Sequence, residues 1–354
     1  MYGAWPNYRK RAGYLQIQVS GRCNICAKSY YTFIYIANVN HLEMLIEIDE
    51  VKGREAAKLL YDTFNSEGVF ARKEMPEDLI PNGISIGSLE HILFITMTVS
   101  IDYRRNATAM WKSAKATYED EETRYLFNPK AVSQTPLGEI ESDMRKHGLS
   151  AKPRKDPAIW KTVGTSFAEK WGGNPLALIK DCGWDAMSIL KRLKDGSHEH
   201  QGKRISDFPY LRGDKIGPLW LRMLKDTCLV TDIQGLEQCP VPVDVHVARA
   251  TINIGVITGQ FEGRMEALYP SIRNAWFKSV EGLQAVGRPM VALDVDNPLW
   301  HLSKYGCTKR TMDRKCGMSR ICPVRDLCIG KDAAMVQGDF VKLSLLPSKE
   351  HILS

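Results

Sequence analysis

The 354-residue chain is long enough for two or three folding units, and 44% hydrophobic residues suffice to build buried cores. No stretch approaches the roughly 18 consecutive apolar residues of a membrane span, and the N-terminus lacks the apolar core of a secretion signal. We therefore expect a cytoplasmic protein with no membrane partner, associated with the nucleoid if it is prokaryotic. The net charge of +7 is too mild to indicate a nucleic-acid partner by itself.

Three segments near the N-terminus alternate apolar and polar residues with the two-residue period of half-buried strands. These segments are residues 14–19, 30–36 and 45–48. Residues 1–53 are therefore predicted to form a small β module. A turn-like stretch inside this module carries Cys23 and Cys26. No second cysteine pair lies nearby, so we expect no metal there and leave open a role at a hairpin tip or in substrate contact.

From about residue 54 the apolar residues recur at helical spacing. The segments with this pattern are 54–65, 89–118, 136–147, 158–171 and 176–194, and residues 217–280 also have a mainly helical pattern. The body of the protein is thus predicted to be mainly α, with several short helices rather than one bundle of long ones.

Four of the nine cysteines crowd into a short segment near the C-terminus. They are Cys307, Cys316, Cys322 and Cys328, with the spacing C-x8-C-x5-C-x5-C. Four thiolates on one loop can bind either an iron–sulfur cubane or a tetrahedral zinc. Zinc knuckles usually place their ligands in C-x2-C pairs, and no gap here has two residues. The spacing therefore favours a [4Fe–4S] cluster over zinc and over four unrelated thiols.

Basic residues surround these cysteines, with only two acidic residues between positions 304 and 331. Among them are Lys309, Arg310, Arg314 and Lys315. A basic loop beside a metal site suits contacts with a phosphate backbone, although a solvated basic face would have the same composition.

Two further segments have a weaker chemical signal. A glycine-bearing turn with Gly213 and Lys215 precedes an apolar helical run, and backbone N–H groups at such a helix start can bind a phosphate. Asp244 opens another helical run, where an aspartate is most often a simple N-cap. The same position keeps a carboxylate ionised, which also suits stabilisation of positive charge on a reacting sugar.

These segments, in this order, resemble the endonuclease III-like branch of the helix-hairpin-helix DNA glycosylases. Gly213-Asp-Lys215 is similar to the end of the family hairpin, and Pro242-Val-Asp244-Val-His-Val-Ala-Arg249 to the segment that bears the catalytic aspartate. Cys322-Pro-Val-Arg-Asp-Leu-Cys328 resembles the last two ligands of the family's iron–sulfur loop. Upstream, Asp102-Tyr-Arg-Arg-Asn106 and the segment from Met144 to Lys152 resemble further family motifs, so the resemblance covers about residues 54–330.

The resemblance implies two helical subdomains that contain a helix-hairpin-helix motif and end in a [4Fe–4S] loop. One helical block would span about 85–230, and a second would combine 54–84 with 231–306. The cluster loop would be 307–328, followed by a tail at 331–354. The resemblance also implies that Lys215 and Asp244 face each other across a cleft between the subdomains.

Carried over to this sequence, the resemblance makes Lys215 the amine nucleophile and Asp244 the catalytic carboxylate. An amine that attacks C1′ forms a Schiff base, which permits strand cleavage by β-elimination. Leu149 stands where the family inserts a wedge beside the flipped-out base, and Gly213 and Arg249 are further expected DNA contacts. Without the resemblance, Lys215 would be interpreted as an exposed lysine in a first helical turn.

Four departures from the family pattern concern the expected site. Leu211 replaces the first glycine of the hairpin, and Val99 replaces a glutamine that fills the gap left by the flipped base. Residues 231–240 are an apparent insertion between Lys215 and Asp244, and the first two cysteine gaps are longer than in the family. Leu211 and Val99 put the family's usual substrate, an oxidised pyrimidine, in doubt.

We therefore expect a monomeric DNA N-glycosylase, with possible AP-lyase activity, that excises a damaged or modified base from double-stranded DNA. Base excision repair and defence against modified foreign DNA, such as that of a phage, both fit. The alternative is a non-catalytic DNA-binding protein that kept the fold and the cluster to recognise DNA structure or modified bases. The presence of both Lys215 and Asp244 favours the enzyme.

Overall fold

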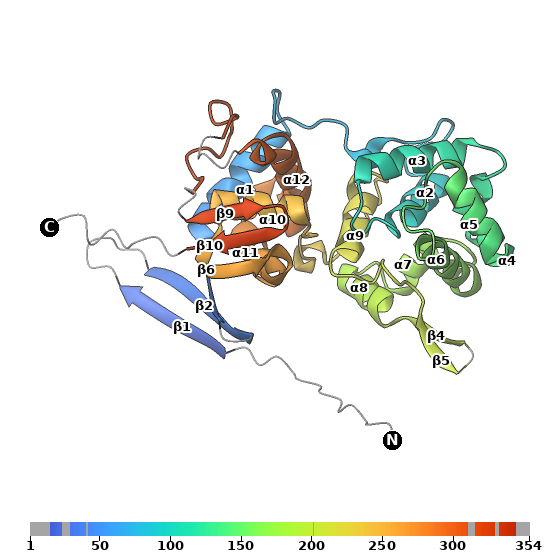
Figure 1. The fold of residues 1–354 in the computed structure, drawn as a ribbon, viewed down its shortest axis with the longest axis horizontal. Helices are drawn as coiled ribbons and strands as arrows, with labels where there is room; N and C mark the ends of the chain where they lie inside the picture. The colour runs from blue at the N-terminus through green and yellow to red at the C-terminus, as the bar shows by residue number, and fades with distance from the viewer. Residues whose placement is uncertain are drawn as a thin grey trace, which may run out of the picture. The chain divides into compact units, whose positions relative to one another are not determined.

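The computed structural model describes residues 15–22, 29–39, 42–200, 202–310, 316–329 and 333–344. Within these ranges the chain forms twelve α-helices and a set of antiparallel sheets (Figure 1). The predicted mainly α class is confirmed. No helix in the described ranges combines the length and the apolar character that a membrane crossing requires. Cys23 and Cys26 lie outside these ranges.

The chain divides into two compact units, each built from separate segments of sequence. Unit 1 comprises 1–63, 243–280 and 299–354, and unit 2 comprises 64–242 and 281–298. The predicted helical blocks divide the chain differently, because they group 64–84 and 231–242 with the C-terminal segments. The structure instead joins both stretches to unit 2, where Glu77 contacts Arg222, and Ile233 and Cys239 enter the hydrophobic core.

Unit 1 contains a six-stranded antiparallel sheet with the order β1-β2-β3-β6-β10-β9. The strands are β1 (Leu15–Arg22), β2 (Ser29–Val39), β3 (Leu42–Ile48), β6 (Ile257–Arg264), β9 (Ala334–Gln337) and β10 (Phe340–Leu343). The three predicted N-terminal strands therefore form half of a larger sheet rather than a separate module. The predicted C-terminal tail supplies two strands of its other half.

Strand β6 corrects the prediction that residues 217–280 are mainly helical. Its side chains alternate between buried and more exposed positions, and it pairs with β3 from Leu45–Gln260 to Ile48–Ile257. Gly259 is needed at this pairing, because it has a φ of +130° and a Cβ there would lie 2.0 Å from the Leu45 carbonyl oxygen. The strand thus depends on a partner more than 200 residues away in sequence.

Four helices complete unit 1. They are α1 (Glu50–Phe64), α10 (Val245–Ile254), α11 (Tyr269–Val280) and α12 (Asp296–Tyr305), the first turn of α12 lying in unit 2. Helix α10 packs against β6 and β9, and α11 packs against β3 and β6. Apolar side chains of β3 and β10, including Ile46, Ile48 and Val341, are buried. Helix α10, which Asp244 caps, therefore contacts both the sheet and α11.

Unit 2 is almost entirely helical. Its helices are α2 (Leu89–Val99), α3 (Ala107–Glu119), α4 (Pro129–Gln134), α5 (Leu137–Lys146), α6 (Asp156–Trp171), α7 (Pro175–Asp181), α8 (Ala186–Asp195) and α9 (Ile216–Asp226). Two short hairpins, β4 (Ser197–His200) with β5 (Lys203–Ser206) and β7 (Gln284–Ala285) with β8 (Arg288–Pro289), complete it. The predicted helical segments 89–118 and 176–194 are each divided into two helices.

Helix α2 is the centre of the unit 2 core. Its apolar side chains point in all directions, and it contacts α3, α6, α7 and α9. Phe94 packs against Trp111 with the ring centroids 5.8 Å apart, and the Trp220 indole N–H of α9 donates to Thr96 Oγ1 at 3.0 Å. These contacts fix α9, and with it the residue that precedes it, against the interior of the unit.

Short polar side chains determine where the helices begin. Asn106, Asn128, Asn174 and Asp185 each accept backbone N–H groups at the start of α3, α4, α7 and α8 respectively. In α4 and α7 a proline follows the cap and fixes the first helical φ angle. These caps explain why the two longer predicted segments are interrupted.

A buried guanidinium joins three separate segments of unit 2. Arg222 of α9 donates to Glu77 Oε1 at 2.6 Å and to Asp296 Oδ2 at 3.1 Å, and all three side chains are less than one-tenth exposed. Burial alone would lower the pKa of Arg222, but the carboxylates of Glu77 and Asp296 raise it above its usual value. The guanidinium therefore stays charged inside the unit.

Removing the guanidinium should destabilise the protein strongly, because two buried carboxylates would lose their partner. We expect Arg222→Met to lower the free energy of unfolding by about 3–5 kcal/mol, measured by urea denaturation followed by tryptophan fluorescence.

The matched control is Arg192→Met, which removes an exposed ion pair with Asp181 and should cost less than about 1 kcal/mol. Equal effects of the two substitutions would show that Arg222 does not hold the three segments together.

Candidate functional site

The turn before α9 carries Lys215, the predicted nucleophile. Between α8 and this turn lies the β4–β5 hairpin. The sequence pattern did not predict this hairpin. The Gly213 N–H donates to the Tyr210 carbonyl at 2.9 Å, and a Cβ at Gly213 would lie 3.1 Å from that oxygen. A side chain at this position would therefore be tight against that carbonyl, and the Gly213 N–H is already used within the turn. Leu211, in place of the expected first hairpin glycine, is fully buried and anchors the turn in the core.

The amine of Lys215 lies beside a buried carboxylate. Lys215 Nζ is 3.4 Å from Asp102 Oδ2 and 3.5 Å from the Asp102 carbonyl oxygen. The Lys215 side chain is 26% exposed and that of Asp102 only 7%. A half-buried lysine with one face open to solvent can reach a ligand while the carboxylate fixes its position. Asp102 was noted in the sequence only as part of a motif, and its contact with Lys215 was not predicted.

Asp244 is the N-cap of α10 in unit 1. Its Oδ1 accepts the backbone N–H groups of His246 at 2.7 Å and Val247 at 2.9 Å. Within the described residues Oδ2 makes no hydrogen bond. The simpler interpretation of Asp244 as a cap is therefore confirmed, and the cap leaves one carboxylate oxygen for a ligand.

Aromatic and basic side chains lie near this cap. The His246 ring is 5.4 Å from Trp300, and His246 Nδ1 is 3.2 Å from Ser303 Oγ. Lys304 Nζ lies 4.3 Å from the Trp300 ring centroid, and burial lowers the pKa of this lysine. Arg249 Nη1 reaches Ser303 Oγ at 3.5 Å. Helices α10 and α12 together therefore present a basic and aromatic surface beside Asp244.

The four predicted cluster ligands share one neighbourhood in unit 1. Burial, together with the negative charges of Cys328, Cys322 and Cys316, raises the pKa of Cys307 to about 12, while a hydrogen bond with Asn253 opposes this. Burial likewise raises the pKa of Cys328 to about 11. Electrostatic interaction extends over several ångströms, so it does not require the thiols to be in contact. Among the described residues, no three His, Cys, Asp or Glu side chains have the arrangement of a metal site. The described thiols therefore interact electrostatically but do not have the geometry of a metal site.

Asn253 attaches the cysteine loop to α10. Its Oδ1 accepts from Arg310 Nη1 at 2.6 Å, and its carbonyl accepts the Ile329 N–H at 3.0 Å. Arg310 Nη2 also donates to the Ile329 carbonyl at 3.0 Å. Arg310, a predicted phosphate contact, therefore closes the loop internally. No feature of the sequence indicated the role of Asn253.

The other predicted DNA contacts have different surroundings. Leu149 is fully buried in the unit 2 core, so its side chain does not offer the expected wedge. Its carbonyl accepts from Arg105 at 2.8 Å. Val99 is also fully buried. Arg314 and Lys315 lie outside the described residues, and Lys309 is described only in its backbone.

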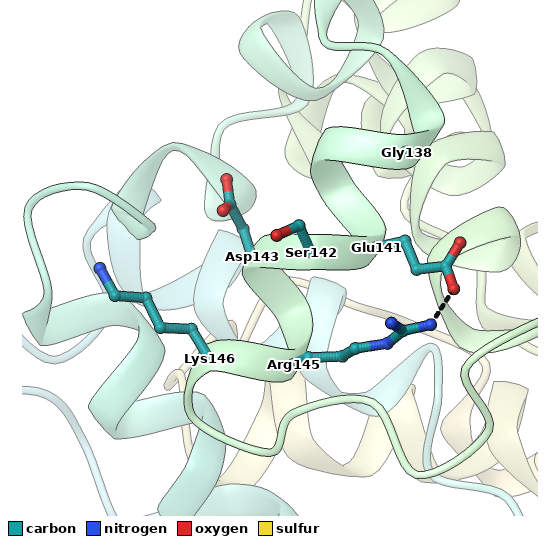
Figure 2. A pocket seen from close by; sticks show the side chains of 6 residues that line it. All are labelled: Gly138, Glu141, Ser142, Asp143, Arg145 and Lys146. Atoms are coloured by element: carbon teal, nitrogen blue, oxygen red, sulfur yellow. Dashed lines mark hydrogen bonds and ion pairs between the residues drawn. The ribbon is translucent and has the colours of Figure 1, made fainter.

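One hollow of the surface, of about 610 Å³, is formed on α5 by Gly138, Glu141, Ser142, Asp143, Arg145 and Lys146 (Figure 2). It is strongly charged and open, and Glu141 and Arg145 pair with each other across one helical turn. Because it contains no buried reactive group, we assign no chemistry to it. Lys215 and Asp244 do not line this hollow.

The chain matches no family model, and no curated protein shows significant sequence similarity to it. The relationship to helix-hairpin-helix glycosylases therefore stays a prediction, based on the sequence motifs and their order.

Gly255 determines how closely the cysteine loop approaches α10. It ends α10 with a φ of +83°, and a Cβ there would lie 2.4 Å from Ile329 Cγ2. We expect Gly255→Ala to lower the free energy of unfolding by about 1–2 kcal/mol for the left-handed backbone, with an added cost for the clash. Thermal and urea unfolding would measure it.

Gly282→Ala is the matched control, since Gly282 has a φ of +70° but no atom within 4 Å of a Cβ. It should show the backbone cost alone. Shortening the neighbour in Gly255→Ala/Ile329→Ala should recover the additional loss, and no recovery would contradict the proposed contact.

Proposed function

We propose that this protein is a DNA N-glycosylase that flips out and excises a damaged or modified base. The observation that carries the proposal is the half-buried amine of Lys215, fixed beside Asp102 at the start of a helix anchored in the core. Such an amine is accessible to a ligand on one side and held in position on the other, as a nucleophile requires. The order of the sequence motifs supplies the reaction class.

In the proposed reaction, Lys215 loses a proton and attacks C1′ of the deoxyribose, and the bond between C1′ and the base breaks. The departing base takes up a proton, and the sugar ring opens to a Schiff base with the lysine. Loss of a proton from C2′ then expels the 3′ phosphate by β-elimination. By the sequence resemblance, the Asp244 carboxylate would stabilise the positive charge that develops on the sugar.

The cysteine loop fits the chemistry of a [4Fe–4S] cluster through its four thiols, whose charges affect one another. When bound, the cluster would act as a structural clamp on the loop. Residues of the chain itself also hold the loop in place, because Asn253 and Arg310 attach it to α10, the helix that Asp244 caps. The loop's remaining basic residues would then bind DNA phosphates.

The experiment that tests the reaction is a base-release screen on duplexes with single oxidised, deaminated, mismatched or hypermodified bases, with borohydride present to reduce any Schiff base. We expect base release and a covalent adduct on at least one duplex. Lys215→Ala should abolish the adduct, whereas Lys194→Ala should not, although Lys194 lies near the same turn and pairs with Asp214. An adduct that survives Lys215→Ala would remove this lysine from the mechanism.

Two substitutions separate the charge of Asp244 from its role as a cap. Asn is also a good N-cap, so Asp244→Asn should change stability by less than about 0.5 kcal/mol and lower the rate of base release at least about 100-fold. Asp244→Ala should lose about 1 kcal/mol of stability as well. Base release at the wild-type rate by Asp244→Asn would exclude the catalytic role of this carboxylate. DNA binding without base release from any substrate would favour the non-catalytic DNA-binding protein.

Iron analysis tests the cluster independently of activity. We expect brown protein with broad visible absorbance and about four iron atoms per chain. Cys322→Ser should lower the iron content, and Cys182→Ser, at a thiol in unit 2, should leave it unchanged. Colourless protein with one zinc per chain would contradict the cluster.

A further inference from the structure

Two tyrosines near Lys215 form an exposed aromatic pair that the proposed reaction does not use. Tyr103 follows α2, and Tyr210 lies in the turn before α9. Their ring centroids are 5.1 Å apart with an angle of 41° between the planes. Tyr103 is 38% exposed, and Tyr210 is half-buried. Aromatic surface is thus open to solvent where the turns after α2 and before α9 meet.

Cationic side chains lie over these rings. Lys152 Nζ is 5.0 Å from the Tyr103 ring centroid and 5.6 Å from that of Tyr210, and it donates to the Tyr103 carbonyl. The Arg104 guanidinium carbon is 5.4 Å from the Tyr103 ring centroid. These distances are in the range of cation–π contacts. The rings and the cations therefore belong to one cluster.

The charge around the cluster is positive. Burial lowers the pKa of Lys152, and Arg105, Lys155 and Arg104 lower it further, while Asp156 opposes them. A set of neighbouring cations that disfavour one another's charge would be stabilised by an anionic ligand.

The acidic groups of this region are already used inside the unit. Asp156 accepts from Arg105 Nη1 at 3.4 Å and from the backbone N–H groups of Ala151 and Lys152, each at 2.9 Å. Asp102 pairs with Lys215. Both carboxylates are buried. The surface that remains for a ligand is therefore aromatic and cationic.

Aromatic rings combined with cations are the groups that bind single-stranded nucleic acid, since rings stack on bases and cations neutralise phosphates. A paired base keeps its flat faces inside the duplex stack, whereas an unpaired base exposes them. We propose that Tyr103, Tyr210, Lys152 and Arg104 form a binding site for one unpaired nucleotide of DNA, with its base on the tyrosine rings and its phosphate at the cations.

This site would border the proposed reaction centre. Tyr103 directly follows Asp102, the partner of Lys215, and Tyr210 lies in the same turn as Lys215. The inference rests on the proposed function only in taking DNA as the ligand. It supplies a way for unit 2 to favour duplexes in which a base has left the stack, a role for which the buried Leu149 is not available.

The test compares binding of two labelled duplexes of equal length, one fully paired and one with a single unpaired 2-aminopurine. Fluorescence anisotropy gives the affinities, and quenching of 2-aminopurine reports stacking. We expect the wild-type protein to bind the duplex with the unpaired base about tenfold more tightly, as expected for one base stacked on an aromatic side chain. Tyr103→Leu/Tyr210→Leu should lose this preference and the quenching while retaining affinity for the paired duplex.

Three further variants separate stacking from stability. Tyr103→Phe keeps the ring and should keep the preference. Phe277→Ala removes a ring of unit 1 that is 44% exposed and should also keep it. Lys152→Gln should weaken binding of the unpaired base several-fold and reduce the dependence of affinity on salt, which tests the site even if the double leucine variant does not fold.

The proposal is overturned if the wild-type protein shows no preference for the unpaired base, if the folded double leucine variant keeps it, or if Lys152→Gln changes neither affinity nor salt dependence. Base release measured on the same proteins distinguishes this inference from the proposed reaction. A preference that depends on the tyrosines without any base release would support the site and contradict the glycosylase. Base release without such a preference would support the glycosylase and contradict the site.

Discussion

The buried charge of Arg222 is the constraint on which the arrangement of unit 2 depends. A guanidinium without partners would be very costly at this depth, so it requires both Glu77 and Asp296. These carboxylates come from segments that lie 145 residues before and 74 residues after it in sequence. The ion pairs thus specify which segments pack together, a requirement that apolar contacts alone, being non-directional, impose less strictly.

The same helix connects this constraint to the candidate site. Helix α9 begins next to Lys215, packs on α2 through Trp220 and carries Arg222 in its interior. Asp102, the partner of Lys215, follows the end of α2. The lysine and the carboxylate are therefore positioned by two helices packed in the core, and the lysine side chain keeps 26% of its surface exposed. A reactive amine needs such a fixed position more than it needs a deep pocket.

The sequence predicted the features that depend on local pattern. Most helices, the three N-terminal strands and the cap at Asp244 follow from periodicity and from short polar side chains at helix starts. It did not predict β6, because the eight-residue strand from Ile257 to Arg264 becomes a strand through its pairing with β3 and with β10. The contacts of Asn253 and Asp102 were missed for the same reason, since each joins residues far apart in the chain.

Residues predicted to bind DNA show why type and position in a motif are insufficient. Arg310 has the right charge for a phosphate, yet its guanidinium is bound to Asn253 and to the Ile329 carbonyl. Leu149 has the apolar side chain of a wedge but lies in the core. Conversely, the sequence pattern did not indicate a role for the tyrosines beside Lys215, because a tyrosine among polar residues has no periodic signal. The proposed role depends on two turns that bring their rings together and on Arg105 and Lys215, which pair with the acidic residues around them.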